Sequence, residues 1–188
     1  MTNPQHPQSL AVPVEPSDHR QGAEHAPVTL IEYGDFECPS CRVAAPTIPL
    51  LLERHANKIR FVYRHFPIED AHPHALGAAQ AAEAAGAQGR FWPMHDLLFQ
   101  NQAHLKGKDL VRYAASLGLD LTRFNADVSG QVYLQRIREQ IEGGRRSHLR
   151  ATPTFFLNGV LVDVSYGMQS LHDAVDAAVR STARSLGG

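Results

Sequence analysis

Residues 29–41 have the sequence TLIEYGDFECPSC, in which an apolar run leads to two cysteines. Its apolar first half predicts a strand over residues 28–33, followed by a tight turn. The segment Cys38-Pro39-Ser40-Cys41 then begins a helix that we expect over residues 39–55. The chain has 2 cysteines, and both lie in this segment, on one helical turn. Two thiols at this spacing can close and reopen a small disulfide, or they can supply half of a zinc site.

Composition indicates a globular chain with a core of its own. The 188 residues are 43% hydrophobic, and the formal net charge of -1 argues against a nucleic-acid or anionic-membrane partner. No apolar run approaches the roughly 18 residues of a membrane span. Residues 1–24 are rich in Pro, Gln, His and Ser, so we expect a flexible tail there, whose last residues could add an edge strand. Because these residues do not resemble a secretory signal, we expect a cytoplasmic protein.

Hydrophobic periodicity predicts an α/β fold with a large helical block. Residues 59–66 form a second predicted strand, which completes a βαβ unit with the first strand and the helix. Pro46 is expected to kink that helix because proline removes a backbone donor. The remaining predicted elements are helices over 75–88, 91–100, 109–117 and 131–142, a hairpin over 154–164 turning at Asn158-Gly159, and a last helix around 171–179.

The position of Cys38 favours redox chemistry over a structural role. A helix start stabilises an anion through unpaired N–H groups and the macrodipole, so it favours a Cys38 thiolate. Pro39 suits the first turn because its missing N–H has no helical partner there. Cys41 lies one turn deeper and is expected to be less exposed. The apolar neighbours of Glu32 in its strand predict a buried carboxyl with a raised pKa, suited to accepting a proton.

Several segments in order resemble the DsbA-like thiol-disulfide oxidoreductases of the thioredoxin superfamily, from about Pro27 to Val179. They are TLIEYGDFECPSC, the proline Pro46 five residues after Cys41, the stretch QGRFWPMHDLLFQNQ (88–102) and Thr152-Pro153-Thr154 with its following hairpin. The resemblance implies a thioredoxin fold over 25–70 and 148–188, with an inserted helical domain over 71–147. The long interval between Cys41 and Pro153 agrees with such an insertion.

The resemblance also implies roles for the site residues. Cys38 attacks or is attacked, Cys41 resolves the mixed disulfide, and Glu32 moves the proton of Cys41. Thr152 precedes a cis-Pro153, and this pair binds an extended substrate strand through its main chain. No cofactor is expected beyond the redox-active disulfide Cys38–Cys41, and no metal. The implied partners are disulfide-containing proteins and a thiol reductant or redox partner, without nucleic acid or membrane.

Ser40 leaves the direction of the reaction open. Strongly oxidising members of the family carry histidine between the cysteines, whereas serine brings no charge. The expected activity is therefore thiol-disulfide exchange, as a reductase, isomerase or oxidase. The alternative is a non-catalytic module that binds a client chain or a metal, and a glutathione-transferase-like enzyme is a third hypothesis that Cys41 argues against. The 11 histidines contain no His-x₃-His pair, but His65, His72 or His74 could tune the site electrostatically.

Overall fold

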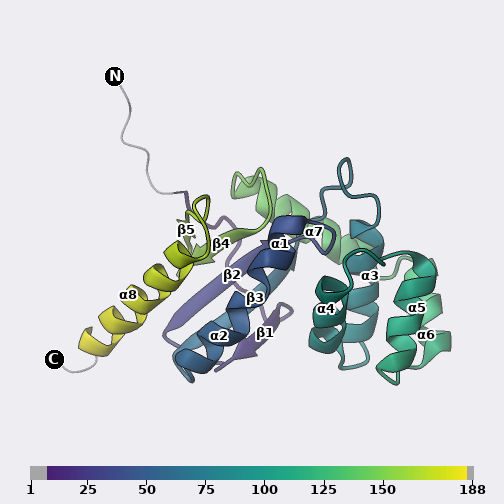
Figure 1. Cartoon of the computed structure of the whole chain (residues 1–188), viewed down its shortest axis with the longest axis horizontal. Helices are drawn as coiled ribbons and strands as arrows, with labels where there is room; N and C mark the ends of the chain where they lie inside the picture. The colour runs from purple at the N-terminus through teal and green to yellow at the C-terminus, as the bar shows by residue number, and fades with distance from the viewer. Residues whose placement is uncertain (1–7, 186–188) are drawn as a thin grey trace. The chain divides into compact units, whose positions relative to one another are not determined.

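A single mixed sheet organises the strands (Figure 1). The structure is a computed structural model that describes residues 8–185. Its strands are β1 (His19–Gly22), β2 (Val28–Gly34), β3 (Ile59–His65), β4 (Thr154–Leu157) and β5 (Val160–Val162). They lie in the order β1-β3-β2-β4-β5, with β1 antiparallel to β3, and β4 antiparallel to both β2 and β5. The predicted α/β class is confirmed.

Helices follow and interrupt these strands. Along the described residues they are α1 (Pro39–Ala44), α2 (Thr47–Arg54), α3 (Ala75–Gly86), α4 (Phe91–Gln100), α5 (Gly107–Ser116), α6 (Leu121–Ser129), α7 (Leu134–Arg146) and α8 (Gln169–Ser185). The chain divides into two compact units. The first unit extends to Tyr33 and includes Pro46–Arg64 and the described residues from Gly143 onward. The second unit holds Gly34–Ala45 and His65–Glu142.

The first unit is built on strands that are covered along most of their length. In β2 only Thr29 is not fully buried, which explains why the strand reads as a nearly continuous apolar run. The helices α2 and α8 are joined at their surfaces by Asp176. Its carboxylate lies 2.9 Å from Arg54 Nη2 and 2.7 Å from His55 Nε2.

The N-terminal segment, where we expected a flexible tail over residues 1–24, contains β1, the edge strand that its last residues could add. Residues 1–7 lie outside the described part, but from residue 8 onward the chain makes defined contacts with the first unit. The Ala11 N–H donates to Ser147 Oγ at 2.9 Å, and β1 pairs with β3 at the sheet edge. At the end of β1, a Cβ on Gly22 would lie 2.3 Å from the Ile59 carbonyl oxygen, so only glycine fits there.

Buried alanines in α3 allow close helix packing in the second unit. The buried residues of α3 include Ala78, Ala79, Ala81, Ala82, Ala84 and Ala85. These small side chains let neighbouring helices approach closely, and α3 contacts α4, α5 and α6. The same unit contains α1, which contacts α4. The cysteine-bearing turn therefore rests on the helical part of its own unit.

Several helices differ from the prediction. The helix expected over residues 39–55 is two helices, α1 and α2, separated at Ala45 and Pro46, where we expected only a kink. Helix α6 was not predicted. Helix α7 continues to Arg146 instead of ending before Gly143, because that glycine is a packing residue: a Cβ there would lie 3.2 Å from Val12 Cγ2.

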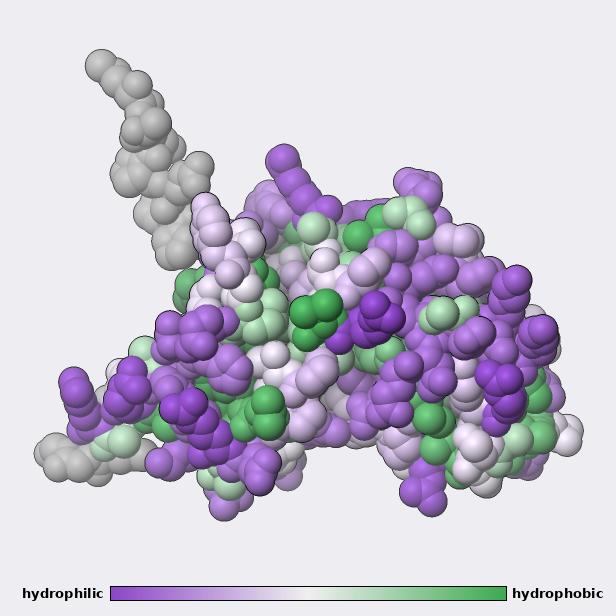
Figure 2. All heavy atoms as spheres, viewed as in Figure 1, coloured by the Kyte–Doolittle hydropathy of each residue, from purple (hydrophilic) through white to green (hydrophobic). Residues whose placement is uncertain are grey.

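Polar residues cover most of the face shown in Figure 2, and the apolar residues on it form small groups. Exposed apolar side chains include Val43, Leu50 and Tyr166. Among residues 8–185, none of the helices combines the length and the apolar character that a membrane crossing requires.

Candidate functional site

The two cysteines occupy the first turn of α1. Cys38 is the N-cap residue, with φ -72° and ψ 121°, and Pro39 takes the first helical position, as predicted. The Cys38 N–H donates to the Asp35 carbonyl at 3.1 Å, which closes the turn before the helix. Cys38 and Cys41 lie 3.7 Å apart, beyond the about 2.05 Å of a disulfide bond, so both are thiols in this structure. Cys38 is 6% exposed and Cys41 0%, which gives Cys38 the better access to solvent.

Asp35 organises the turn that leads to Cys38. Its carboxylate is fully buried, and Oδ1 accepts the Glu37 N–H while Oδ2 accepts the Ile68 N–H, both at 2.8 Å. The same Oδ2 lies 2.7 Å from Nδ1 of His72. A buried carboxylate needs hydrogen bonds and an opposite charge, and these groups supply both. Sequence reasoning did not single out Asp35.

This arrangement favours the protonated, positively charged form of His72. Burial alone would lower the pKa of His72. The hydrogen bond and charge of Asp35, together with the charges of Cys38 and Glu37, outweigh burial and raise the pKa above its ordinary value of 6.5. Of the three histidines proposed to tune the site, His72 therefore interacts electrostatically with Cys38.

The raised pKa of His72 predicts a pH-dependent stability. A group with a raised pKa in the folded state stabilises most below its unfolded pKa of about 6.5, and this contribution is lost as the pH rises through the folded pKa. We expect the urea midpoint of the wild type to exceed that of His72→Gln at pH 5.5, with a smaller gap at pH 8.5. A gap that stays constant between these pH values would contradict the prediction.

Gln102 fixes the backbone on the other side of Cys38. Its Nε2 donates to the Phe36 carbonyl at 2.9 Å and to the Cys38 carbonyl at 2.8 Å. Gln102 ends the stretch QGRFWPMHDLLFQNQ, which entered the prediction only as a point of resemblance. No local pattern indicates this contact, because Gln102 and Cys38 are 64 positions apart.

Phe36 belongs to the same turn, and its ring packs in an aromatic cluster. Its ring centroid lies 4.9 Å from that of Phe99, 5.6 Å from His95 and 5.8 Å from His65. His65 Nε2 also lies 3.0 Å from the buried Glu83. These two histidines therefore belong to the packed interior. Across residues 8–185 there is no group of three or more His, Cys, Asp or Glu side chains that could hold a metal ion.

The first unit brings Glu32 and the predicted substrate loop onto neighbouring strands. Glu32 is 1% exposed in β2 and pairs in register with Phe155 of β4. The peptide bond between Thr152 and Pro153 is cis, and β4 begins at the next residue, Thr154. Because the cysteines belong to the second unit, the proton-transfer role of Glu32 and the substrate-binding role of Thr152 and Pro153 stay predictions.

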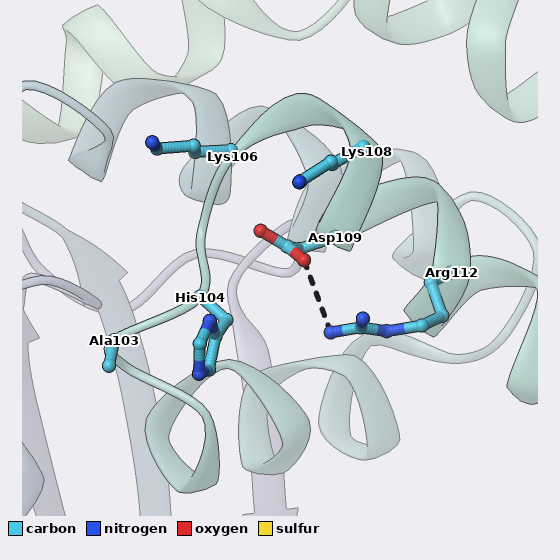
Figure 3. Close-up of a pocket in the computed structure, with 6 residues that line it drawn as sticks. All are labelled: Ala103, His104, Lys106, Lys108, Asp109 and Arg112. Atoms are coloured by element: carbon cyan, nitrogen blue, oxygen red, sulfur yellow. Dashed lines mark ion pairs between the residues drawn. The ribbon is translucent and has the colours of Figure 1, made fainter.

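A basic pocket in the second unit was not predicted (Figure 3). It has a volume of about 520 Å³ and is lined by Ala103, His104, Lys106, Lys108, Asp109 and Arg112. Asp109 Oδ1 forms an ion pair with Arg112 Nη2 at 3.1 Å, drawn as a dashed line in Figure 3. Two lysines and an arginine against one carboxylate give the pocket a positive charge. The lining begins at Ala103, one residue after Gln102.

These features together define a thioredoxin-fold protein of the DsbA-like kind: a mixed sheet, a helix opening at Cys-x-x-Cys and a cis-proline before an antiparallel strand. A protein-family model described as Thioredoxin matches residues 15–177. The chain belongs to this thioredoxin family.

Known proteins agree with this fold. The Na(+)/H(+) antiporter NhaA 1 of Salinispora arenicola (strain CNS-205) is 48% identical over 174 residues, covering 92% of this chain and 26% of the antiporter. The chain thus spans about a quarter of the length of this curated relative. A thioredoxin-like oxidoreductase from Silicibacter pomeroyi DSS-3 has a TM-score of 0.77 at 28% identity, covering 88% of this chain and 94% of that one. For alpha-DsbA1 of Wolbachia pipientis the TM-score is 0.79 at 21% identity, with 94% and 98% covered. The predicted DsbA-like thioredoxin fold is confirmed.

The predicted cytoplasmic location is wrong. The Salinispora relative is named an antiporter, which is a membrane protein. A periplasmic thioredoxin-like protein from Salmonella enterica serovar Typhimurium also shares the fold, with a TM-score of 0.72 at 18% identity, covering 88% of this chain and 92% of that one. Our prediction relied on the lack of a leader in the first residues. In the antiporter the matching region is only part of a longer protein, so the first residues of this region do not report the compartment.

Proposed function

We propose that this chain exchanges thiols and disulfides through Cys38 and Cys41. The observation that carries the proposal is the pair of thiols 3.7 Å apart on the first turn of α1, within a DsbA-like fold. The proposed substrates are disulfide-containing proteins, with a thiol reductant or other redox partner to restore the pair. In keeping with the corrected location, we place the exchange outside the cytosol, where disulfides persist.

The exchange proceeds in two balanced steps. The Cys38 thiolate attacks one sulfur of a substrate disulfide, so a mixed disulfide forms and the other substrate sulfur leaves as a thiolate. Cys41 then loses its proton and attacks the Cys38 sulfur, which releases the second substrate thiolate and closes Cys38–Cys41. Two electrons pass to the substrate, and the reverse sequence oxidises a substrate dithiol. In this scheme Glu32 accepts the Cys41 proton, and the main chain at Thr152 pairs with the substrate.

The direction of electron flow depends on the reduction potential of the pair relative to its partner. A difference of about 30 mV changes the equilibrium constant about tenfold for this two-electron couple. Equilibration of the protein in glutathione buffers of known ratio, followed by acid quenching and thiol labelling, measures that potential. A potential near that of the cytosolic glutathione pool would favour reduction or isomerisation of substrates, and a much more oxidising one would favour disulfide formation.

Insulin-disulfide reduction by dithiothreitol tests the proposed activity. Micromolar protein is expected to speed the precipitation of the insulin B chain above the rate with dithiothreitol alone. The matched control is the same protein reduced and then alkylated at both thiols with iodoacetamide. Equal rates for the active and alkylated protein would refute the proposed function and leave a non-catalytic binding module.

A further inference from the structure

Three hydrogen bonds connect the turn before Cys38 with the segment 68–74, which contains His72. Asp35 Oδ2 accepts from the Ile68 N–H and lies 2.7 Å from His72 Nδ1, while the His74 N–H donates to Glu37 Oε2 at 2.6 Å. The segment 68–74 is thus hydrogen-bonded to residues 35–37 at both of its ends. This places the His72 ring beside the turn that positions Cys38, although the two residues are far apart in the sequence.

A Cys38 thiolate needs a nearby positive charge, because the charged side chains of its own turn are acidic. Asp35 and Glu37 are both acidic and both belong to its turn, and Ser40 carries no charge. Two carboxylates oppose a thiolate on their neighbour. Asp35, Cys38 and Glu37 all act on His72 by their charge and raise its pKa, so among these groups the His72 imidazolium supplies positive charge.

We propose that His72, held by Asp35, is the positioning residue that stabilises the Cys38 thiolate, and this inference rests on Cys38 being the nucleophile of the proposed exchange. When His72 is protonated, the Asp35–His72 pair is neutral and its positive end acts on Cys38. When His72 loses its proton, the pair keeps only the negative charge of Asp35. The reactivity of Cys38 therefore follows the protonation of His72 as well as its own.

The coupling between the two groups is reciprocal. The thiolate raises the pKa of His72, so the imidazolium must lower the pKa of Cys38 by the same free energy. An opposite charge within about 4–6 Å shifts a pKa by about 1–3 units, and the shift is smaller at longer range. The His72 side chain is 18% exposed, so solvent screens it in part, and we expect the lower end of this range.

The test measures the pKa of Cys38 in protein that has no other thiol. In a Cys41→Ser background, Cys38 is the sole cysteine, and thiolate absorbance or iodoacetamide alkylation against pH gives its pKa. Adding His72→Gln is expected to raise this pKa by about one unit. At a pH well below the Cys38 pKa of both proteins, the thiolate fraction then falls about tenfold. The alkylation rate falls only about threefold, because a more basic thiolate is a better nucleophile.

Two further variants separate charge from structure. His72→Lys keeps a cation and is expected to leave the Cys38 pKa within about 0.5 unit of the parent, where a purely structural role would shift it as His72→Gln does. His74→Gln is the matched control. His74 donates its backbone N–H to Glu37, and the substitution keeps this donor. An unchanged Cys38 pKa in folded His72→Gln, or equal shifts in His72→Lys and His72→Gln, would overturn the inference.

An NMR titration covers the case in which His72→Gln does not fold. The His72 ring pKa in reduced protein is expected to fall when Cys38 is replaced by serine, and an unchanged value would again overturn the inference. These measurements do not require turnover. If insulin reduction persists while the Cys38 pKa ignores His72, only this inference fails. If turnover is absent while the coupling is present, the proposed function fails instead.

Discussion

Replacing Cys38 with serine is expected to reduce the rate of insulin-disulfide reduction to that of dithiothreitol alone. The serine hydroxyl is not ionised near neutral pH, so it cannot replace the thiolate that attacks the substrate sulfur. Cys38 caps α1 and is 6% exposed, whereas Cys41 lies inside the turn at 0%. The more accessible sulfur should therefore meet the substrate first. The turbidity assay with wild type, Cys38→Ser and Cys41→Ser in parallel measures this prediction.

Cys41→Ser is expected to give a different defect. Cys38 can still attack, but the mixed disulfide with the substrate is no longer resolved within the protein, so it accumulates. A non-reducing gel and intact-protein mass should show an insulin-chain adduct that dithiothreitol removes and that the double variant does not form. Each variant should also keep the urea midpoint of the wild type. Full turnover by folded Cys38→Ser, or adducts on Cys38→Ser instead of Cys41→Ser, would show that the assigned roles are wrong.

The local part of the fold could be predicted because its determinants are close in sequence. The helix expected over 91–100 is α4, and Asn158-Gly159 makes the expected hairpin turn, with φ angles of 49° and 82°. Helix α6 was missed although Asp120 caps it by accepting the Arg123 N–H at 3.0 Å. Its only fully buried residue is Phe124, so its apolar pattern is weak.

In the candidate site, too, the features with local determinants could be predicted and those that join distant residues could not. The cysteines and their helix start follow from a four-residue motif, in which Cys38 is the N-cap of α1 and Pro39 its first residue. The supporting contacts join distant segments: Asp35 and His72 are 37 positions apart, and Gln102 is 64 from Cys38. No local spacing encodes such pairs, because they form only when the helical part of the second unit packs against the turn.

The first unit contains a buried ion pair that the sequence did not reveal. The side chains of Arg64 and Asp18 are 3% and 5% exposed. Arg64 Nε donates to Asp18 Oδ1 at 3.0 Å and Nη2 donates to Oδ2 at 2.7 Å, a bidentate pair. The remaining guanidinium hydrogens reach the Val12 and Pro13 carbonyls and the Tyr33 hydroxyl. Burial alone would lower the pKa of Arg64, but Asp18 and Tyr33 raise it above its usual value. Arg64 therefore holds residues 12–18 on the sheet.

Replacing Arg64 with methionine is expected to lower the free energy of unfolding by about 3–5 kcal/mol. Methionine keeps much of the aliphatic volume, but it leaves the Asp18 carboxylate buried without its cation and two carbonyls without their donor. Urea unfolding followed by circular dichroism measures the change. The N-terminal segment should also become more sensitive to limited proteolysis before Val28, because its anchor on β3 is lost.

The matched control is Arg54→Met, which removes another arginine–aspartate pair in the same unit. Arg54 lies 2.9 Å from Asp176, but its side chain is 59% exposed, so solvent screens the pair and its loss should cost at most about 1 kcal/mol. The double variant Arg64→Met with Asp18→Leu should recover part of the stability lost in Arg64→Met, because it no longer buries an uncompensated charge. A loss below about 1 kcal/mol for Arg64→Met, equal to that of Arg54→Met, would show that water reaches Asp18 and that the N-terminal segment is held by other contacts.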